Sequence, residues 1–568
     1  MTTDDSRPER RGAAYVYDAL VEAGVDLLVG LPGTQTLPLD RTVAQRDEIR
    51  YVMARHETAI PHVAWGYHES GGGIAATLTV PGPGETNAAH GLKNAFDDCV
   101  PMIHLTADVN PDERGRSPIH EIDPSTYDHV VKENVVIDRP IELRAGLERA
   151  IGAALTPPCG PVRVGIPSGL LDSAVRAQPV SVDVESVAFD NEVEYEAAIE
   201  LLATAERPLV YVGGGAARSP GADEPIRTLV KELDAPTLTT YKGKGVVPES
   251  DDRWLGVSAS HLPAGGKRAL AAADVVVAFG TDFDLIMTAG STIPFGDRLI
   301  HVTLDPDHVD TREPADVAIL DDAASAAERL LSGVRAHKDG NGTDGGGWSG
   351  PEVARTVRAE YDDRLREQSL LDDEPPLPSA FALRVLREAI PSEAFVAADV
   401  GAFRLWAAQN FPADDHARYV TAGSWAGMGV GLPAAIGAKL ADPERPSVAI
   451  VGDGCLMMSL QELHTAAQEG LDVVTIVCND SDYGAISKSP KIAEYGDGAR
   501  FSWTTPDFPT IAEGFGCRAV RVETPDEIRT AVAEAIERED GPELIDVRID
   551  PDEPTPAAAA DYESELTF

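Results

Sequence analysis

Two aspartates, each directly after a short apolar run, are the residues best placed for chemistry. Asp453 stands in a Gly-Asp-Gly triplet after the run 446–451 (PSVAIV), and Asp480 follows the run 471–478 (LDVVTIVC). Residues 459–469, between the two runs, have helical spacing, so the pattern predicts a strand, a helix and a parallel strand. Both carboxylates then lie at carboxyl ends of strands, where open α/β sheets bind ligands.

Hard oxygen ligands at such an edge suit Mg²⁺, which takes one or two carboxylates and completes its shell with phosphate oxygens. Gly452 and Gly454 would let the backbone approach those phosphates, because a side chain there would obstruct them. A Gly-Asp-Gly triplet by itself is usually a turn. Followed by a second strand that ends in Asn479-Asp480, it indicates a metal and phosphate site.

The elements around this site alternate between helical and strand patterns along the whole chain, which predicts an α/β protein with parallel sheets. In the first third we expect helices at 11–23, 58–69 and 87–97, and strands at 26–30, 49–53, 73–80 and 102–106. Further strands are expected at 209–212, 236–240, 274–279 and 299–304. The predicted organisation is three consecutive α/β domains at 1–175, 190–335 and 377–552, with a linker at 336–376 and an acidic tail at 553–568.

Composition narrows the class of protein. The 568 residues are too many for one core and carry 94 acidic against 48 basic side chains, a formal net charge of −46. No basic face for nucleic acid is visible. We interpret the acidic runs, including 552–563, as a solvated shell, and the even excess favours a salt-rich cytosol where screening reduces repulsion.

Neither a membrane span nor a secretory signal is expected, because the apolar runs are short and the first residues are polar. The predicted location is therefore cytoplasmic. The five cysteines show no metal-binding spacing, and we interpret them as small buried residues.

The segment from Gly452 to Asp480, GDGCLMMSLQELHTAAQEGLDVVTIVCND, resembles the diphosphate motif of thiamine-diphosphate enzymes. The resemblance is to their acetohydroxyacid synthase, pyruvate oxidase and decarboxylase branch, and it covers nearly the whole chain. It implies that Asp453 and Asp480 ligate Mg²⁺, with the backbone carbonyl of Asp482 as a third ligand. Asp480 replaces the more usual Asn, which keeps an oxygen ligand but alters the local charge.

Two further stretches, 397–401 (AADVG) and 423–434 (GSWAGMGVGLPA), also match that family. The resemblance implies thiamine-diphosphate-binding folds in the first and third domains and a Rossmann-like middle domain. It makes Met428 the residue that holds the cofactor in a bent shape. The cofactor contacts it implies in the third domain are Val400, Gly401, Ala426, Met428, Gly452, Gly454, Cys455 and Tyr483.

In the first domain the resemblance makes Glu57 the catalytic carboxylate. A Glu before a helix is common, since it offsets the helix dipole. In the family this residue hydrogen-bonds the cofactor's pyrimidine and assists removal of the thiazolium proton. Pro83 and Asn87 would contact the same ring, and Asn87 could also cap a helix. Gly33 belongs to another loop that lies beside the cofactor in the family. Because the family builds each site from two subunits, a homodimer or homotetramer with interfacial active sites is implied.

Other positions depart from the acetohydroxyacid synthase pattern. His120, in Ile119-His120-Glu121, stands where a Phe-Gln-Glu segment is usual; it could exchange a proton with a bound intermediate or be inert. Ser168 and Asp282 replace a Lys and an Arg that govern the second substrate. Lys242 and Lys244 could meet an anionic ligand, but we favour a solvated turn. The Gly213-Gly-Gly215 turn is a weak dinucleotide signal, and its flanking residues do not favour FAD.

The resemblance implies a thiamine-diphosphate- and Mg²⁺-dependent enzyme that decarboxylates a 2-oxo acid and forms a new carbon–carbon bond. Overall likeness favours the acetolactate synthase catalytic subunit, an enzyme of branched-chain amino acid biosynthesis. One alternative is a non-oxidative decarboxylase of benzoylformate or indolepyruvate type. Another is a non-catalytic cofactor-binding relative, against which Glu57 argues. No nucleic acid or membrane partner is expected.

Overall fold

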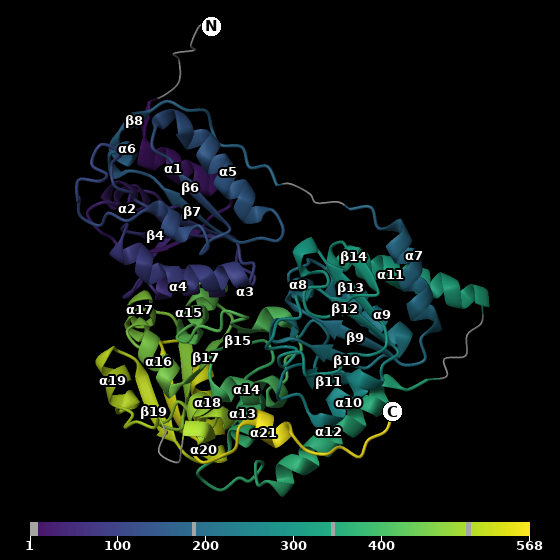
Figure 1. Ribbon diagram of the computed structural model, residues 1–568. Coiled ribbons are helices and arrows are strands. Elements are labelled where there is room, and N and C mark those ends of the chain that lie inside the picture. The colour runs from purple at the N-terminus through teal and green to yellow at the C-terminus, as the bar shows by residue number, and fades with distance from the viewer. Residues whose placement is uncertain (1–8, 185–188, 342–346, 496–500) are drawn as a thin grey trace.

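The computed structural model describes residues 9–184, 189–341, 347–495 and 501–568. Its framework is three six-stranded sheets in which every neighbouring pair of strands is parallel (Figure 1). This confirms the α/β class and the three parallel sheets. Each sheet lies inside one predicted domain range, while the domain boundaries themselves stay predictions.

The first sheet has the strand order β3-β2-β4-β5-β7-β6. Its strands are β2 (Leu27–Gly30), β3 (Arg50–Met53), β4 (Ala75–Thr79), β5 (Met102–Thr106), β6 (Glu133–Val136) and β7 (Pro161–Gly165). The helices are α1 (Gly12–Glu22), α2 (Leu37–Val43), α3 (Ala59–Glu69), α4 (Pro83–Asp97), α5 (Leu143–Leu155) and α6 (Ser168–Asp172). A short antiparallel pair, β1 (Arg10–Arg11) and β8 (Ala174–Val175), joins the two ends of this domain.

The central sheet has the order β11-β10-β9-β12-β13-β14. Its strands are β9 (Pro208–Val212), β10 (Thr237–Thr239), β11 (Trp254–Val257), β12 (Val275–Phe279), β13 (Leu299–Thr303) and β14 (Val317–Leu320). The helices are α7 (Glu192–Thr204), α8 (Gly214–Ala217), α9 (Asp223–Leu233), α10 (Ala264–Ala272), α11 (Ala323–Asn341) and α12 (Gly350–Glu367). The predicted linker 336–376 thus holds the end of α11 and all of α12, while residues 342–346 lie outside the described part.

The third sheet has the order β16-β15-β17-β18-β20-β19. Its strands are β15 (Phe395–Ala398), β16 (Tyr419–Thr421), β17 (Ser447–Gly452), β18 (Val473–Asn479), β19 (Arg518–Val522) and β20 (Glu543–Arg548). The first helices are α13 (Ser379–Ala389), α14 (Ala402–Asn410), α15 (Gly431–Ala441), α16 (Asp453–Ser459) and α17 (Glu462–Glu469). The others are α18 (Gly484–Ser487), α19 (Phe508–Gly514), α20 (Pro525–Glu537) and α21 (Pro556–Ala560).

The predicted elements are present, with two differences near the candidate site. The helix expected at 87–97 begins at Pro83, whose fixed φ suits a first helical position. Asn87 therefore lies inside α4, and the prediction that it caps the helix is wrong. The single helix expected at 459–469 is replaced by α16 and α17, and α16 begins at Asp453 itself.

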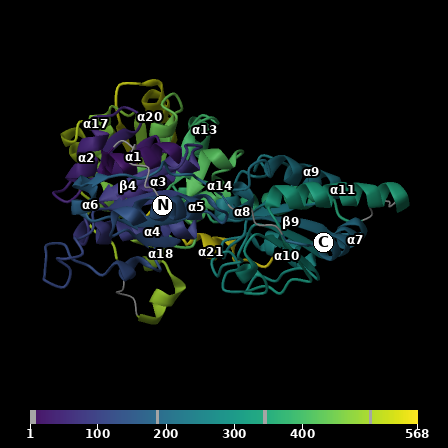
Figure 2. The same cartoon turned by 90° about the horizontal axis from the view of Figure 1, so that it is seen from above.

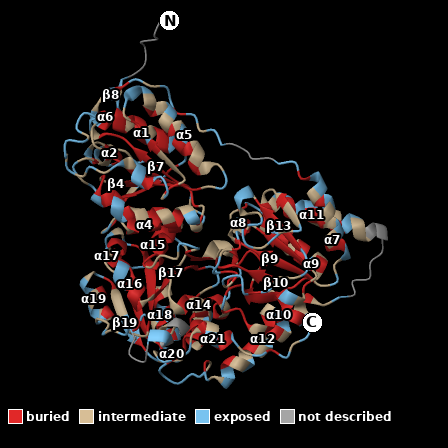
Figure 3. Cartoon of the chain, in the orientation of Figure 1, coloured by how far each residue is buried: buried red, intermediate tan, exposed pale blue. Residues whose placement is uncertain are grey.

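Helices α3 and α15 form the layer between the first and third sheets (Figure 1). Their backbones approach closely because each contributes a glycine to the contact. A Cβ on Gly66 would lie 2.2 Å from the Ala434 carbonyl oxygen, and one on Gly437 would lie 2.0 Å from the Val63 carbonyl oxygen. One hydrophobic core spans both domains here, and Figure 3 shows buried residues in this layer as well as in the sheets. Seen from above, the central domain extends to one side of the other two (Figure 2).

The acidic tail packs against the protein, yet Asp552, Asp561 and Glu563 are exposed, so the interpretation of a solvated shell fails only at Glu553. Glu553 is buried and accepts hydrogen bonds from the Ser379 backbone N–H and hydroxyl at 2.7 and 2.6 Å. Leu566 and Phe568 pack on the core of the central domain. The tail therefore connects the third domain to the central one.

The cysteine prediction holds in part. Cys455, Cys478 and Cys517 are buried, while Cys99 and Cys159 are half-buried, and all five thiols are free. No helix in the described ranges is long and apolar enough to cross a membrane.

Candidate active site

Asp453 and Asp480 lie at the same edge of the third sheet. Asp453 directly follows β17 and Asp480 directly follows β18, and these strands pair in parallel with Gly452 opposite Cys478. Asp453 Oδ1 accepts a hydrogen bond from the Gly454 N–H at 2.8 Å. Burial, with a further contribution from Asp480, raises the pKa of Asp453 to about 7. Burial also raises the pKa of Asp480.

The second carboxylate oxygen of Asp453 indicates that this edge of the sheet suits a cation. Asp453 Oδ2 is buried and has no hydrogen-bond donor among the described residues. The backbone N–H of Ser481 acts on this carboxylate as a nearby donor, but it donates at 3.2 Å to Asn479 Oδ1 and not to Oδ2. Since a buried carboxylate oxygen without a donor is costly, a cation is the partner that would satisfy it.

The donor set fits Mg²⁺. Within the described ranges no three His, Cys, Asp or Glu side chains gather into a closed metal site. Mg²⁺ does not require one, because it readily combines one or two carboxylates with other oxygens, including those of a phosphate. Asp482 is buried two residues after Asp480, and its N–H donates to Asp480 Oδ1 at 3.2 Å, so its carbonyl belongs to the same turn.

The glycines of the triplet keep this edge open. A Cβ on Gly454 would lie 2.7 Å from the Tyr483 ring, so only glycine fits there. Tyr483 stacks on Trp503 with ring centroids 6.2 Å apart.

Cys455 Sγ donates to the Val400 carbonyl oxygen at 2.6 Å, which joins the start of α16 to the loop before α14. Gly401 has φ +148°, a conformation that favours glycine.

Asp399 organises the neighbouring loop and was missed by the sequence analysis. Its Oδ1 accepts hydrogen bonds from the N–H groups of Val400 (2.7 Å) and Gly429 (3.0 Å), and its Oδ2 accepts from Gly431 N–H (2.8 Å). It thereby fixes the loop that contains Met428, which is partly buried against the core. The signal was present: Asp399 is the acidic residue of AADVG, directly after a strand.

The same loop docks on the first domain. A Cβ on Gly427 would lie 2.1 Å from the His90 imidazole, and Trp425 Nε1 donates to His90 Nδ1 at 3.0 Å. Ala426, between them, has a left-handed backbone with φ +49°. A non-glycine residue held there is strained, and such strain is concentrated at functional sites.

Lys242 belongs to a buried junction of all three domains, so its interpretation as part of a solvated turn is wrong. Its side chain is 12% exposed, and Nζ lies 3.0 Å from Glu69 Oε1 and 3.3 Å from Asp98 Oδ2. Asp98 Oδ1 in turn accepts from the Gly423 N–H at 3.1 Å, at the start of the loop that contains Met428. Lys244 is 1% exposed and pairs with Glu249, so it is not solvated either.

Glu57 lies in the loop between β3 and α3 and is half-buried. Its Oε2 accepts a hydrogen bond from the Asn87 side-chain amide at 3.0 Å, which brings two predicted site residues together. The preceding residue is held by the third domain, because Glu462 Oε1 accepts from the His56 N–H at 3.0 Å. Buried Glu462 was also missed, since no local pattern links α17 to a loop so distant in the chain.

The other first-domain candidates gather at the ends of β2, β4 and β5. A Cβ on Gly33 would lie 2.2 Å from the Val80 side chain, and one on Gly82 would lie 2.7 Å from the His120 carbonyl oxygen. Pro83 follows Gly82 as the first residue of α4. His120 has φ +66°, and its Nδ1 lies 3.1 Å from Gln35 Nε2.

His120 also lines a cavity of about 470 Å³. The cavity is lined by Pro81, Asp108, Val109, Arg114, Gly115, His120, Glu121, Ile122, Asp123 and Pro124. It lies beside the strand ends that carry the predicted pyrimidine contacts. The imidazole at its wall offers a ring nitrogen as a hydrogen-bond donor or acceptor to a bound group.

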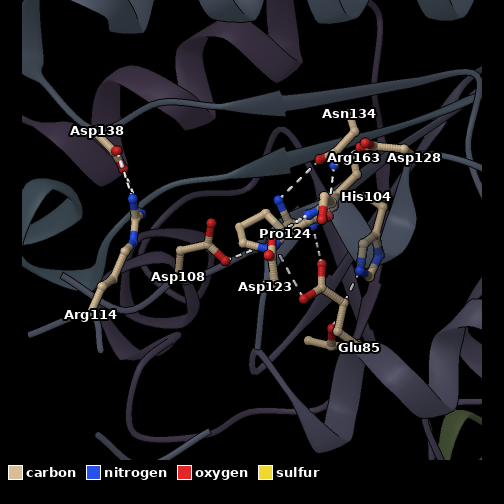
Figure 4. A network of polar contacts seen from close by, with 12 residues as sticks. Glu85, His104, Asp108, Arg114, Asp123, Pro124, Asp128, Asn134, Asp138 and Arg163 are labelled. Carbon is tan, nitrogen blue, oxygen red and sulfur yellow. Dashed lines mark hydrogen bonds and ion pairs between the residues drawn. The ribbon is translucent and has the colours of Figure 1, made fainter. Parts of the chain in front are cut away.

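A buried ionic network supports this cavity (Figure 4). Arg163 of β7 pairs with Glu85 of α4 and with Asp108, whose Oδ1 lies 2.7 Å from Arg163 Nη2. Arg163 Nη1 also donates to the Asn134 side chain at 3.2 Å. Burial raises the pKa of Glu85 to about 7, although Arg163 opposes the rise. Glu85 lies between the predicted contacts Pro83 and Asn87, and no local sequence pattern indicated its buried partner Arg163.

Comparisons with known proteins cover this whole arrangement. Residues 10–127, 195–330 and 399–547 match the N-terminal TPP binding, central and C-terminal TPP binding domains of thiamine pyrophosphate enzymes. The acetolactate synthase large subunit of Corynebacterium glutamicum is 30% identical over 95% of this chain and 87% of its own length. A probable acetolactate synthase large subunit of Methanocaldococcus jannaschii is 30% identical over 96% of this chain and 93% of its own length. The acetolactate synthase isozyme 1 large subunit of Escherichia coli is 28% identical over 97% of this chain and 96% of its own length.

The chain belongs to the thiamine pyrophosphate enzyme family. It is a thiamine-diphosphate-dependent, acetolactate synthase-like enzyme, thiamine diphosphate being the same compound as thiamine pyrophosphate. The predicted recognition and class of enzyme are therefore confirmed. The roles of the individual site residues stay predictions.

Two further positions named from the sequence lie in the central domain. Asp282 is exposed two residues before Asp284, whose carboxylate accepts from the Ser424 hydroxyl at 2.8 Å, so an acidic loop borders the loop that contains Met428. In the central domain, a Cβ on Gly213 would lie 2.3 Å from the Gly280 carbonyl oxygen. That glycine therefore serves close backbone packing at the turn.

Proposed function

We propose that this thiamine-diphosphate-dependent enzyme uses Mg²⁺ to remove CO₂ from a 2-oxo acid and to join the remaining fragment to a second carbonyl compound. The observation that carries the metal assignment is the buried Asp453 Oδ2, which has no donor in the described ranges. The synthase assignment is supported by relatives named acetolactate synthase large subunits. We place the reaction in branched-chain amino acid biosynthesis in the cytoplasm, without FAD.

Each part of the site has a proposed task. Asp453, Asp480 and the Asp482 carbonyl hold Mg²⁺, which binds the diphosphate. When bound, the cofactor supplies a thiazolium ring that accepts the electron pair left as CO₂ departs. Glu57, oriented by Asn87, holds a proton at the pyrimidine ring. The further cofactor contacts are Gly33, Pro83, Val400, Gly401, Ala426, Met428, Gly452, Gly454, Cys455 and Tyr483.

His120 is proposed to act on the substrate. Its place at the wall of the cavity next to Gly82 gives it access to a group bound beside the pyrimidine contacts. Proton exchange with the reacting carbonyl oxygen is the task that its chemistry allows.

A second copy of the chain is proposed to complete each site. Large apolar side chains remain exposed on and beside the metal-bearing edge: Trp425, Met457, Met458 and Ile486. Grouped exposed apolar side chains mark interaction surfaces. A homodimer or homotetramer would cover them and enclose Glu57, which is only half-buried in one chain.

A decarboxylase without a second substrate is the alternative that specific residues favour. Ser168 and Asp282 stand where the family has a Lys and an Arg, and Asp108, Glu121 and Asp123 line the cavity. Without that Lys and Arg, the carboxylate of a second 2-oxo acid would have fewer cationic partners, although Arg114 also lines the cavity.

Product identification tests the proposal. The enzyme is incubated with thiamine diphosphate, Mg²⁺ and pyruvate at high salt. Acetolactate is the expected product. Acetaldehyde alone would favour the decarboxylase, and absence of turnover with every 2-oxo acid tried would contradict both.

A further inference from the structure

Lys488 places a positive charge against the acidic edge of the third sheet. It directly follows α18, and its Nζ lies 3.6 Å from Asp480 Oδ2. The two side chains are only 13% and 9% exposed. Nζ is buried and makes no hydrogen bond of normal geometry within the described ranges; it acts on the carboxylate of Asp480 and electrostatically on that of Glu553.

The neighbouring glycine preserves the geometry of the pair. A Cβ on Gly484 would lie 2.8 Å from Asp480 Oδ2 and 3.5 Å from Lys488 Nζ. A larger residue at 484 would therefore push the carboxylate away from the ammonium group.

The charges at this edge explain why a cation is needed there. Asp453, Asp480 and Asp482 are all largely buried at one edge of the third sheet, where like charges repel more strongly than in water. Arg548 also acts on Asp453 electrostatically, but its Nη2 donates to the Ser481 hydroxyl at 3.4 Å. Lys488 is thus the described cation that pairs with a predicted metal ligand.

We propose that Lys488 is a built-in counter-ion for Asp480 that sets the affinity of the site for Mg²⁺. The usual Asn at position 480 would carry no charge, and the Asp480–Lys488 pair has the same net charge as a neutral amide beside a neutral side chain. In the metal-free protein the ammonium group stabilises the carboxylates. In the loaded site it repels Mg²⁺ and weakens its binding. The inference rests on the proposed function, because it takes Asp453 and Asp480 as the metal ligands.

A double-mutant cycle tests this pairing. Mg²⁺ binding is measured by titration calorimetry at fixed ionic strength, with thiamine diphosphate present, for wild type, Lys488→Met, Asp480→Asn and the double variant. Lys488→Met should bind Mg²⁺ about tenfold more tightly, and Asp480→Asn about tenfold more weakly. The double variant should return to within about threefold of wild type, because the two charges are removed together.

Stability without the metal gives a readout independent of activity. Lys488→Met should lower the thermal midpoint of the metal-free protein and show a larger rise on addition of Mg²⁺ than wild type does. Lys338→Met is the control, since Lys338 lies in the central domain and pairs with Glu232; its Mg²⁺ affinity should equal that of wild type.

The outcomes separate the two proposals. If wild type binds thiamine diphosphate and Mg²⁺ but Lys488→Met binds the metal equally or less well, the counter-ion role is overturned and Lys488 would instead bind a phosphate. If wild type shows no Mg²⁺ binding, the metal site itself is wrong. Lys488→Gln provides the same comparison if the methionine variant does not fold.

Discussion

Glu57 and Asn87 show how a single contact assembles a site at the scale of residues. Glu57 precedes α3 and Asn87 lies within α4, and their side chains meet at 3.0 Å. The Asn87 amide donates to one carboxylate oxygen. That bond fixes the carboxyl group while the other oxygen stays available to a ligand.

Replacing Glu57 by Gln should reduce kcat by at least about 100-fold, because an amide cannot exchange the proton required at the pyrimidine. Mg²⁺-dependent cofactor binding should stay close to that of wild type. Steady-state kinetics and calorimetry measure the two effects. Glu367→Gln, at a solvent-facing position on α12, is the control. An active Glu57 variant would refute the role given to this residue.

Glu553 gives a pH dependence to stability. Burial raises its pKa from the ordinary value of 4.5 to about 7. The folded protein therefore holds this proton more tightly than the unfolded chain, so the stability it contributes is complete below pH 4.5 and is lost as the pH rises to about 7.

Glu553→Gln should remove this part of the pH dependence. The stability of this variant relative to wild type should increase by about 3 kcal/mol between about pH 4.5 and about pH 8. Thermal midpoints of both proteins across this range measure the difference. Parallel curves would show that Glu553 does not titrate in this way.

At the scale of elements, the close pairing of α3 and α15 decides how the first and third domains meet. Gly437→Ala would place a methyl group about as close as 2.0 Å to the Val63 carbonyl oxygen. Because backbone atoms cannot move aside cheaply, the thermal midpoint should fall by several degrees. Gly514→Ala in α19 is the matched control, since a Cβ there meets nothing within 4 Å. Equal midpoints for the two variants would contradict the close contact.

The ionic network around Arg163 joins β7 to α4 and to the end of β5. Arg163→Met would leave Glu85 and Asp108 buried without their cation, which costs about 3–5 kcal/mol. The combination Glu85→Ala, Arg163→Leu and Asp108→Asn should recover much of that loss. Thermal unfolding compares them with Arg144→Met, whose more exposed pair with Glu148 should contribute about 0.5 kcal/mol or less. An unstable triple variant would contradict this account.

At the scale of the whole molecule, the net charge of −46 makes stability depend on salt. Repulsion between surface carboxylates falls as the screening length shortens. The thermal midpoint should therefore rise between about 0.1 M and about 3 M KCl. A midpoint that is unchanged or falls over this range would contradict the proposed salt-rich habitat.

Much of the fold could be predicted because strands buried on both faces appear as short apolar runs, such as 446–451 and 102–106. The position of Asp453 and Asp480 at one edge of the sheet could also be predicted, since they follow neighbouring parallel strands. The partners of Glu462, Asp98 and Arg163 could not. Each contacts residues far away in the chain, and no local periodicity encodes such a contact.

The sequence by itself determined the class of fold, the acidic edge and, through the resemblance of its motifs, the cofactor. These depend on local patterns and on residues directly after strands. Only the tertiary structure decided which charges meet: Lys242 with Glu69 and Asp98, and Lys488 with Asp480. The physical reason is that burial converts an ordinary charged side chain into one that needs a specific partner, and that partner is defined by packing alone.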